Sequence, residues 1–319
     1  MNQRFTRAIA LLCAATIVAV PCVLRADDAV QLRYKAKEGD RSIYEATLST
    51  LVKQSVNGLD IDTKFEQTDV TTYVVKKIGD DGTIQLESRN ERLKVEGDFG
   101  GGASYKFDSQ SEDNDDASEI GAAVPPVYER LSGAILGLEL SPVGKVKKVT
   151  GYTELLKDVL EGNPLGQRFA GGGTDAAAQS GFQDLFVIFK KEAVKPGDSW
   201  EEPYKIEVPQ LGEFKGKRKY TFVGPDKVGE TPTLKITIDV DLSGDLDIDM
   251  GAAKVTGTFE TDSASGTVQF DPVTGRILTM TSEQTYSGDL TVTAGGNTTP
   301  VGFEQTLKIN RKLIDKIPE

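Results

Sequence analysis

The chain has 319 residues with 49 acidic and 37 basic side chains, a formal net charge of −12, and no histidine. An acidic chain repels phosphate backbones, so nucleic acid is not expected as a partner. The lack of histidine excludes the Ser–His–Asp triad and removes the commonest zinc ligand. A pair of carboxylates could still catalyse hydrolysis, but no pair stands out among so many acids. The sequence therefore favours a protein that is not an enzyme, and it predicts no cofactor.

The first 26 residues have the order of a secretory signal peptide. Arg4 and Arg7 are followed by an uncharged run over residues 8–24, and the small residue Ala26 precedes two aspartates. This order predicts export to the periplasm or the extracellular space, with cleavage after Ala26. The 17 apolar residues are few for the ~20 that a membrane-spanning helix needs. An uncleaved anchor is therefore disfavoured, and no stable membrane insertion is expected after cleavage.

Cleavage would also change the chemistry of the chain. Cys13 and Cys22 both lie in the signal segment, so the mature chain has no thiol for a disulfide, a nucleophile or a metal site. Pro21 stands where lipid attachment to Cys22 prefers a small residue, which disfavours a lipid anchor. Loss of three arginines lowers the basic count from 37 to 34 against 49 acids, so the mature net charge is −15.

Alternating apolar and polar residues predict long strands. The pattern occurs over residues 43–56, 234–242 and 303–309. In the second of these, apolar residues at even positions alternate with Lys235, Thr237, Asp239 and Asp241. Such alternation is typical of an antiparallel sheet with one face in water.

Helical patterns are few. We expect helices at 125–133 and within 152–164, the latter with Thr153 as its N-cap. Residues 182–191 are also predicted to be a helix, with a buried strand as the alternative for so short an apolar run. The segments 97–119 and 169–181 are rich in small polar residues, and we expect both to be mobile, insertion-like loops.

Three landmarks occur twice in the same order and indicate an internal repeat. "KEGD" from Lys37 is matched by "KPGD" from Lys195, the strand led by Tyr73 is matched by one led by Tyr220, and "LSPVGKVKKV" is matched by "FDPVTGRILTM". The predicted organisation is a signal peptide over 1–26, a first β repeat with a helical segment over 27–165, and a second β repeat over 166–319. The predicted fold is mainly β, with two pseudo-repeated antiparallel units and a few short helices. One large curved sheet or partly open barrel is favoured over two lobes, because small β units rarely bury both faces alone.

The third landmark raises the question of whether Asp271, Thr274 and Arg276 form a site. Ser141 and Asp271 each precede a proline, which pre-sets the first corner of a turn that a Ser or Asp side chain can cap. Gly144 and Gly275 are expected to supply positive φ at the exit. Recurrence in both halves favours a folding device over a unique site.

The aspartate-rich segment 239–251 is the strongest candidate for a metal site. Asp245, Asp247 and Asp249 are weak candidate calcium ligands, but the glycine and the closing acid of a calcium loop are misplaced. An exposed acidic strand face explains the same pattern. The run 112–116 is interpreted as a solvated loop. Trp200, the single tryptophan, is interpreted as a core residue and not as a ligand platform.

Four stretches together resemble a known family. They are "YKAKEGD", "SPVGKVKKVTG", "VKPGDSW" and "FDPVTGR", and they extend over nearly all of the mature chain. The chain resembles an uncharacterised family of exported bacterial β-rich proteins. The resemblance implies a location in the envelope or outside the cell, and it implies no activity and no catalytic residues.

Two functions remain ahead of an enzyme. In the first, the protein is an extracytoplasmic binding or carrier module whose curved sheet encloses an apolar small molecule or a lipid. This hypothesis predicts a connected apolar cavity on the concave side. In the alternative, it is a structural or interaction protein of the cell envelope, with a packed interior and another envelope protein as its partner.

Overall fold

The structure is a computed structural model, and it describes residues 29–98, 104–112, 114, 125–161, 174–208, 212–249 and 253–318. The signal peptide predicted over 1–26, with its cleavage site, lies outside these residues. So does most of the run 112–116.

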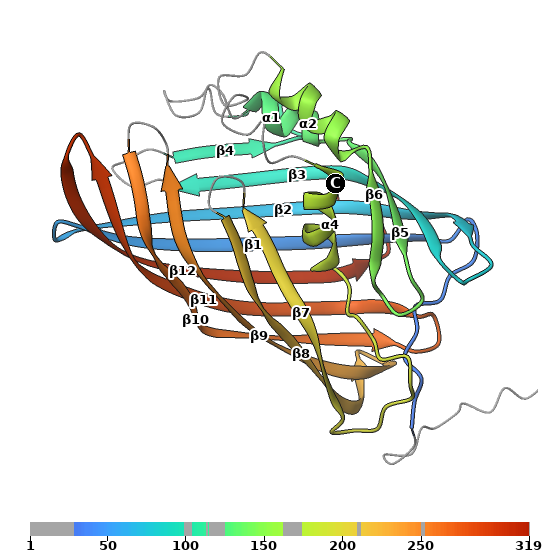
Figure 1. Cartoon of the computed structure of the whole chain (residues 1–319). Helices are drawn as coiled ribbons and strands as arrows, with labels where there is room; N and C mark the ends of the chain where they lie inside the picture. The colour runs from blue at the N-terminus through green and yellow to red at the C-terminus, as the bar shows by residue number, and fades with distance from the viewer. Residues whose placement is uncertain are drawn as a thin grey trace, which may run out of the picture.

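The described strands form one antiparallel sheet that curves strongly without closing into a barrel (Figure 1). Its spatial order is β6-β5-β3-β2-β1-β12-β11-β10-β9-β8-β7, with β4 paired to β3. The strands are β1 (Arg41–Val56), β2 (Leu59–Ile78), β3 (Ile84–Asp98), β4 (Ser104–Asp108), β5 (Ile135–Leu140), β6 (Val146–Thr150), β7 (Ser199–Val208), β8 (Gly212–Val228), β9 (Thr231–Asp249), β10 (Ala253–Asp271), β11 (Arg276–Ala294) and β12 (Asn297–Ile314). The prediction of a mainly β fold built on one large curved sheet is confirmed. The boundary between repeats at 165 and 166 stays a prediction.

Strand alternation decides which side chains face the concave, or inner, side of the sheet. On β9 the even positions Ile236, Ile238, Val240 and Leu242 are buried, whereas Asp239 and Asp241 are exposed. Directly opposed residues in an antiparallel ladder share a face, so the inner face can be followed from strand to strand, and its parity changes only at β-bulges such as that between Thr261 and Ser263. The sequence alternation therefore predicts the two faces of the sheet correctly.

Three helices occur in the described part of the chain: α1 (Pro125–Leu131), α2 (Tyr152–Leu160) and α4 (Asp175–Gln183). The first two confirm the sequence prediction. Thr153 is not the N-cap, which is Gly151; its hydroxyl instead bonds Asp175 Oδ1 at 3.2 Å. The predicted loops also contain regular structure, since β4 lies within 97–119 and α4 begins within 169–181.

The prediction for residues 182–191 is wrong in both of its forms. Helix α4 ends at Gln183, and residues 184–190, here called the inner strap, continue in irregular backbone. Three of its apolar side chains, Phe186, Val187 and Phe189, are buried. The strap needs no regular ladder because partners elsewhere satisfy its backbone: Phe189 N–H donates to Val143 O at 2.8 Å, and Val187 N–H donates to Tyr34 Oη at 2.9 Å.

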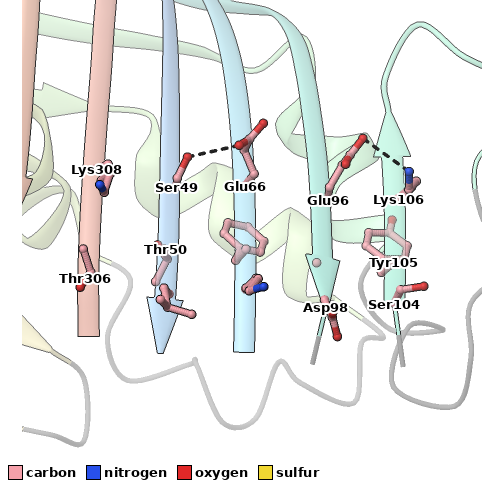
Figure 2. A pocket seen from close by; sticks show the side chains of 14 residues that line it. Ser49, Thr50, Glu66, Glu96, Asp98, Ser104, Tyr105, Lys106, Thr306 and Lys308 are labelled. Carbon is pink, nitrogen blue, oxygen red and sulfur yellow. Dashed lines mark hydrogen bonds and ion pairs between the residues drawn. The ribbon is translucent and has the colours of Figure 1, made fainter. Parts of the chain in front are cut away.

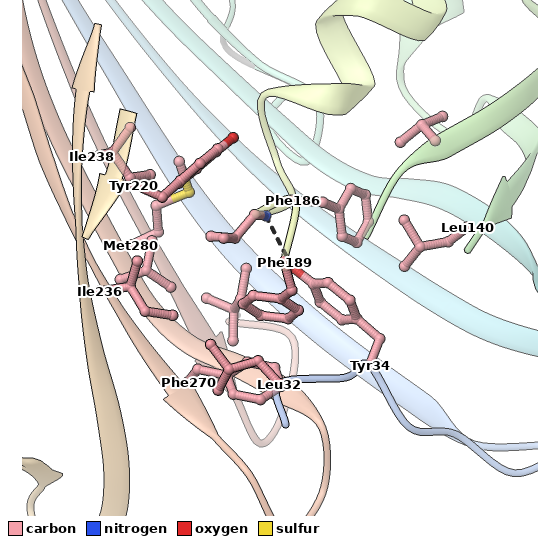
Figure 3. Close-up of a cluster of buried hydrophobic side chains, with 14 of the residues drawn as sticks. Leu32, Tyr34, Leu140, Phe186, Phe189, Tyr220, Ile236, Ile238, Phe270 and Met280 are labelled. Carbon is pink, nitrogen blue, oxygen red and sulfur yellow. Dashed lines mark hydrogen bonds between the residues drawn. The ribbon is translucent and has the colours of Figure 1, made fainter. Parts of the chain in front are cut away.

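The main core lies between the inner face of the sheet, the inner strap and the segment that precedes β1 (Figure 3). Phe189 is its centre: its ring lies 5.0 Å from that of Tyr34 and 4.8 Å from that of Phe270. Trp200 is buried, stacks on Tyr220, and donates Nε1–H to Ile188 O at 2.6 Å. Its predicted role as a core residue is confirmed.

The two K-x-G-D turns make matching hydrogen bonds. Lys37 N–H donates to Asp40 Oδ2 at 2.9 Å, and Lys195 N–H donates to Asp198 Oδ2 at 2.8 Å. In each turn the glycine N–H donates to the neighbouring strand: Gly39 to Val75 O at 2.9 Å, and Gly197 to Phe222 O at 2.7 Å. Each similar sequence thus folds into the same local structure at the entry to a strand.

The two proline turns also behave as predicted. Asp271 Oδ1 accepts from Val273 N–H at 2.8 Å, and Ser141 Oγ accepts from Lys145 N–H at 2.9 Å. Gly144 and Gly275 have φ of 86° and 68°. Both turns contact the segment before β1, because Tyr34 N–H donates to Pro142 O at 2.9 Å and Lys35 N–H donates to Gly275 O at 3.4 Å.

Candidate functional site

The inner face of the sheet changes character along its length. At the end that carries the proline turns, the core covers it. At the opposite end, marked by the β1–β2 and β11–β12 hairpin tips on the left of Figure 1, apolar inner side chains are only half-buried. We call this surface the distal inner face, and it includes Val52, Val56, Ile61, Leu290, Val292, Val301 and Phe303.

Strand register shows that these side chains form one surface. Val56 lies opposite Val301, and Val301 lies opposite Leu290, so three neighbouring strands present apolar residues in a single row. Phe303 follows two residues along β12 on the same face and lies opposite Gln54. The distal inner face is therefore a continuous, mainly apolar surface on the concave side of the sheet.

The outer face over the same strands is polar. Two hollows lie on it, one of about 500 Å³ and one of about 480 Å³. Figure 2 shows the first, where Lys308, Ser49, Glu66, Glu96 and Lys106 follow one another across five strands. Its ion pair between Glu96 and Lys106 spans 3.8 Å and is exposed, so it contributes little to stability. We assign no chemistry to this outer groove.

The metal candidates lie on the outer side of β9. Asp245 and Asp247 are exposed there, and Asp247 Oδ1 lies 2.8 Å from Lys254 Nζ. Asp249 lies on the same strand, but its side chain is not among those that the structure describes. Among the described residues, no three metal-binding side chains are close enough to hold an ion. Asp245 and Asp247 thus lie on an exposed acidic strand face, which is the alternative to a calcium site that the sequence offers.

Asp271, Thr274 and Arg276 do not form a separate site. Asp271 is buried and is used within its own turn, where Thr274 Oγ1 donates to its Oδ2 at 2.6 Å. Arg276 instead forms an ion pair with Asp40 at 3.1 Å. The turn interpretation is confirmed, and Arg276 additionally lies at a small cavity that the sequence analysis did not identify.

This cavity, of about 60 Å³, lies between the sheet, the inner strap and the segment before β1. The charged groups that line it are Lys35, Arg276 and Arg311, and none of the described residues around it contributes a carboxylate. Arg311 is 2% exposed. A signal for it exists in the sequence: on β12 the inner positions Phe303, Leu307, Ile309 and Leu313 are apolar and Gln305 is uncharged, so Arg311 is the one charge in that series.

A half-buried carboxylate lies on the same face two strands away. Ala46 on β1 is opposite both Asp69 and Arg311. Asp69 accepts hydrogen bonds from Gln67 Nε2 at 2.7 Å and Asn90 Nδ2 at 3.1 Å. Burial raises the pKa of Asp69, which the two hydrogen bonds partly offset. It forms no ion pair within the described chain.

Fold and surfaces together define a protein with an open, curved antiparallel sheet, packed at one end and apolar on its inner face at the other. The chain belongs to the family of unknown function DUF6263, whose family model matches residues 81–294. The predicted membership of an uncharacterised family is thereby confirmed. No curated protein matches the sequence. In the described part of the chain, none of the helices has the length and hydropathy to cross a bilayer.

Solved structures give only distant likenesses. A chain described by "lipid-protein interactions in lipovitellin" matches at 7% identity and a TM-score of 0.42, covering 89% of this chain and 26% of that one. The present chain thus spans about a quarter of that protein. DynF from Micromonospora chersina matches at 8% identity and a TM-score of 0.19, covering 98% and 94%. The COG4313 outer membrane channel from Pseudomonas putida F1 matches at 9% identity and a TM-score of 0.21, covering 88% and 97%. Scores at this level do not establish a common fold.

Proposed function

We propose that this protein is a non-catalytic, exported carrier that binds an apolar molecule, such as the acyl chain of a lipid, on the distal inner face. The observation that carries the proposal is the contrast between the two faces of the same strands. Val56, Val301 and Leu290 form an apolar row on the inner side, whereas Lys53 and Glu304 form an ion pair at 2.8 Å on the outer side.

This contrast has a physical reason. A sheet with one wet face normally places its apolar side chains against a core. Here the strands continue past the core and keep most of their inner positions apolar, although the side chains remain half-buried. A bound acyl chain would remove that surface from water, at roughly 25 cal/mol per Å² of apolar area.

The concave shape favours a small apolar ligand over a flat partner surface. The alternative, a structural or interaction protein of the envelope, is supported by the packed core at the other end, where the hollow of about 60 Å³ has no room for an acyl chain. The distal inner face supports the carrier, because its apolar side chains lie on the concave side of the sheet.

The test combines extraction with probe binding. Purified protein should release a lipid or another apolar molecule into organic solvent, detectable by mass spectrometry. After extraction it should bind N-phenyl-1-naphthylamine with enhanced fluorescence. Phe303→Ser should weaken this binding, and Leu51→Ser should not, because Leu51 is a half-buried apolar residue of the neighbouring strand on the outer face.

Two outcomes would overturn the carrier. One is a protein that yields no apolar molecule and does not bind the probe. The other is probe binding that falls equally in both variants, which would place the binding away from the inner face. Either result would favour the envelope role.

A further inference from the structure

The cavity beside Arg311 has the features of a second, separate binding site. It lies at the core end of the sheet and not on the distal inner face, and its lining combines three cations with tyrosine side chains. What this cavity can bind depends on how the charge of Arg311 is compensated.

Arg311 is held by stacking and by one backbone acceptor. Its guanidinium carbon lies 3.7 Å from the ring centroid of Tyr44 and 5.8 Å from that of Phe186. Nη1–H donates to Leu185 O on the inner strap at 2.9 Å. These contacts orient the guanidinium, but a neutral carbonyl and neutral rings do not cancel its full charge.

Among the described residues, two neighbouring cations have a carboxylate partner and Arg311 has none. Arg276 pairs with Asp40 at 3.1 Å, and Lys312, the next residue on β12, pairs with Glu45 at 2.6 Å. No carboxylate in the described chain forms an ion pair with Arg311. A buried, unpaired charge is costly, by several kcal/mol in typical proteins. An anion bound beside Arg311, which is 2% exposed, would therefore stabilise the folded protein.

The surrounding phenols do not supply that anion. Burial raises the pKa of Tyr34, Tyr44 and Tyr73, so all three are neutral near pH 7. Tyr34 Oη accepts from Val187 N–H at 2.9 Å, which leaves its own proton as a donor. Ser42 adds a hydroxyl to the lining, and Lys35 adds an exposed ammonium group.

We infer that this cavity binds a carboxylate group, which pairs with the guanidinium of Arg311. A carboxylate is planar and matches the fork of guanidinium donors. A cavity of only about 60 Å³ suits a carboxylate better than a bulkier anion. The group belongs either to a small free acid or to the end of a longer molecule that extends outward past Lys35.

The test measures thermal unfolding of the whole protein through Trp200 fluorescence, with acetate and chloride compared at equal ionic strength. Acetate should raise the melting temperature in a saturable way, and chloride should not. An octanoate arm separates the two sources by the part of the stabilisation that Arg311→Lys removes. If that part is larger with octanoate than with acetate, the group is the end of a longer molecule; if it is equal or smaller, the group is a small free acid.

Two lysine variants assign the effect to this cavity. Arg311→Lys keeps the charge and removes the fork, so apparent acetate affinity should fall about tenfold or more, since a charge-assisted bond contributes ~1.5–3 kcal/mol. Arg218→Lys is the matched control, because Arg218 is also buried over a tyrosine ring, at 4.0 Å from Tyr204, yet has its own carboxylate, Asp184, at 2.8 Å. The acetate effect should persist in that control.

Loss of the acetate effect in both variants, or in neither, would overturn the assignment to Arg311. If Arg311→Lys does not fold, the wild-type comparison still decides: no stabilisation by acetate over chloride would overturn the site. Neither result depends on the distal inner face, so this inference and the carrier proposal fail separately.

Discussion

At the scale of one residue, Gly275 stands at a position of its turn where a side chain cannot be accommodated. Its φ is 68°, and an added Cβ would lie 2.3 Å from Lys35 N. Gly39 also has a positive φ, 84°, but an added Cβ there would meet nothing within 4 Å. A side chain at Gly39 would therefore meet only backbone strain, whereas a side chain at Gly275 would meet backbone strain and a steric clash.

We predict that Gly275→Ala is more damaging than Gly39→Ala. Gly39→Ala should lower the free energy of unfolding by about 1–2 kcal/mol, because alanine disfavours the left-handed backbone. Gly275→Ala should lower it by about 3 kcal/mol or more, because its Cβ would also displace the segment before β1. Urea unfolding of both variants measures the difference. Equal losses of unfolding free energy in the two variants would show that the close approach of Gly275 to Lys35 does not affect stability.

Asp69 gives a prediction about pH. Because burial raises its folded-state pKa above the usual value of about 3.9, the folded protein holds this proton more tightly than the unfolded chain does. Its stabilising contribution is thus fully present below about pH 3.9 and is lost as the pH rises through the folded-state pKa.

Asp69→Asn should remove this loss. The unfolding free energy of the variant minus that of wild type should be more positive at pH 7 than at pH 3.5. Urea unfolding of both proteins at the two pH values measures this difference. Asp62→Asn is the control for net charge, because Asp62 is an exposed carboxylate on the same strand. A pH dependence that is equally altered by both substitutions would contradict a specific role of burial.

At the scale of elements, the sequence predicts strands and turns well because their signals are local. Alternation fixes the inner face of β9, and Pro with Gly fixes the turns at Pro142 and Pro272. Residues 182–191 are apolar without a period, and their conformation depends on distant partners such as Val143 O and Tyr34 Oη. No local pattern contains that information, so the helix prediction fails there.

The same distinction applies to the candidate sites. Parity places Asp245 and Asp247 on the outer face, and the structure agrees. Parity also places Arg311 on the mainly apolar inner face, where it is the one charged residue that β12 contributes. That Arg311 lacks a carboxylate could not be predicted, because its surroundings come from β1, β2 and the inner strap.

At the scale of the whole molecule, one strand joins the first and last parts of the sheet. The C-terminal strand β12 pairs with β1 on one side and with β11 on the other. The two ends of this strand order are therefore β6 and β7, from the middle of the chain, and α4 with the inner strap lies between them (Figure 1). On the β7 side, Asp184 accepts from Tyr204 Oη at 3.1 Å and from Arg218 Nη2 at 2.8 Å.

On the β6 side, two glutamines of α4 replace a neighbouring strand. Gln179 Nε2 donates to Val146 O at 2.7 Å, and Val146 N–H donates to Gln183 Oε1 at 2.9 Å. Gln183 Nε2 also donates to Gly144 O at 3.0 Å. An uncovered edge strand presents unpaired backbone groups that recruit other chains, so these side chains stabilise the fold and protect its edge.

The double substitution Gln179→Ala with Gln183→Ala tests this closure. It removes three hydrogen bonds to the β6 edge, and at about 1 kcal/mol each the loss of unfolding free energy should be about 2–3 kcal/mol. The exposed edge should also increase self-association, measured by light scattering after size-exclusion chromatography. Ser180→Ala, at an exposed position of the same helix, should change neither property. A double variant as stable and as monodisperse as this control would mean that the β6 edge is protected by something other than α4.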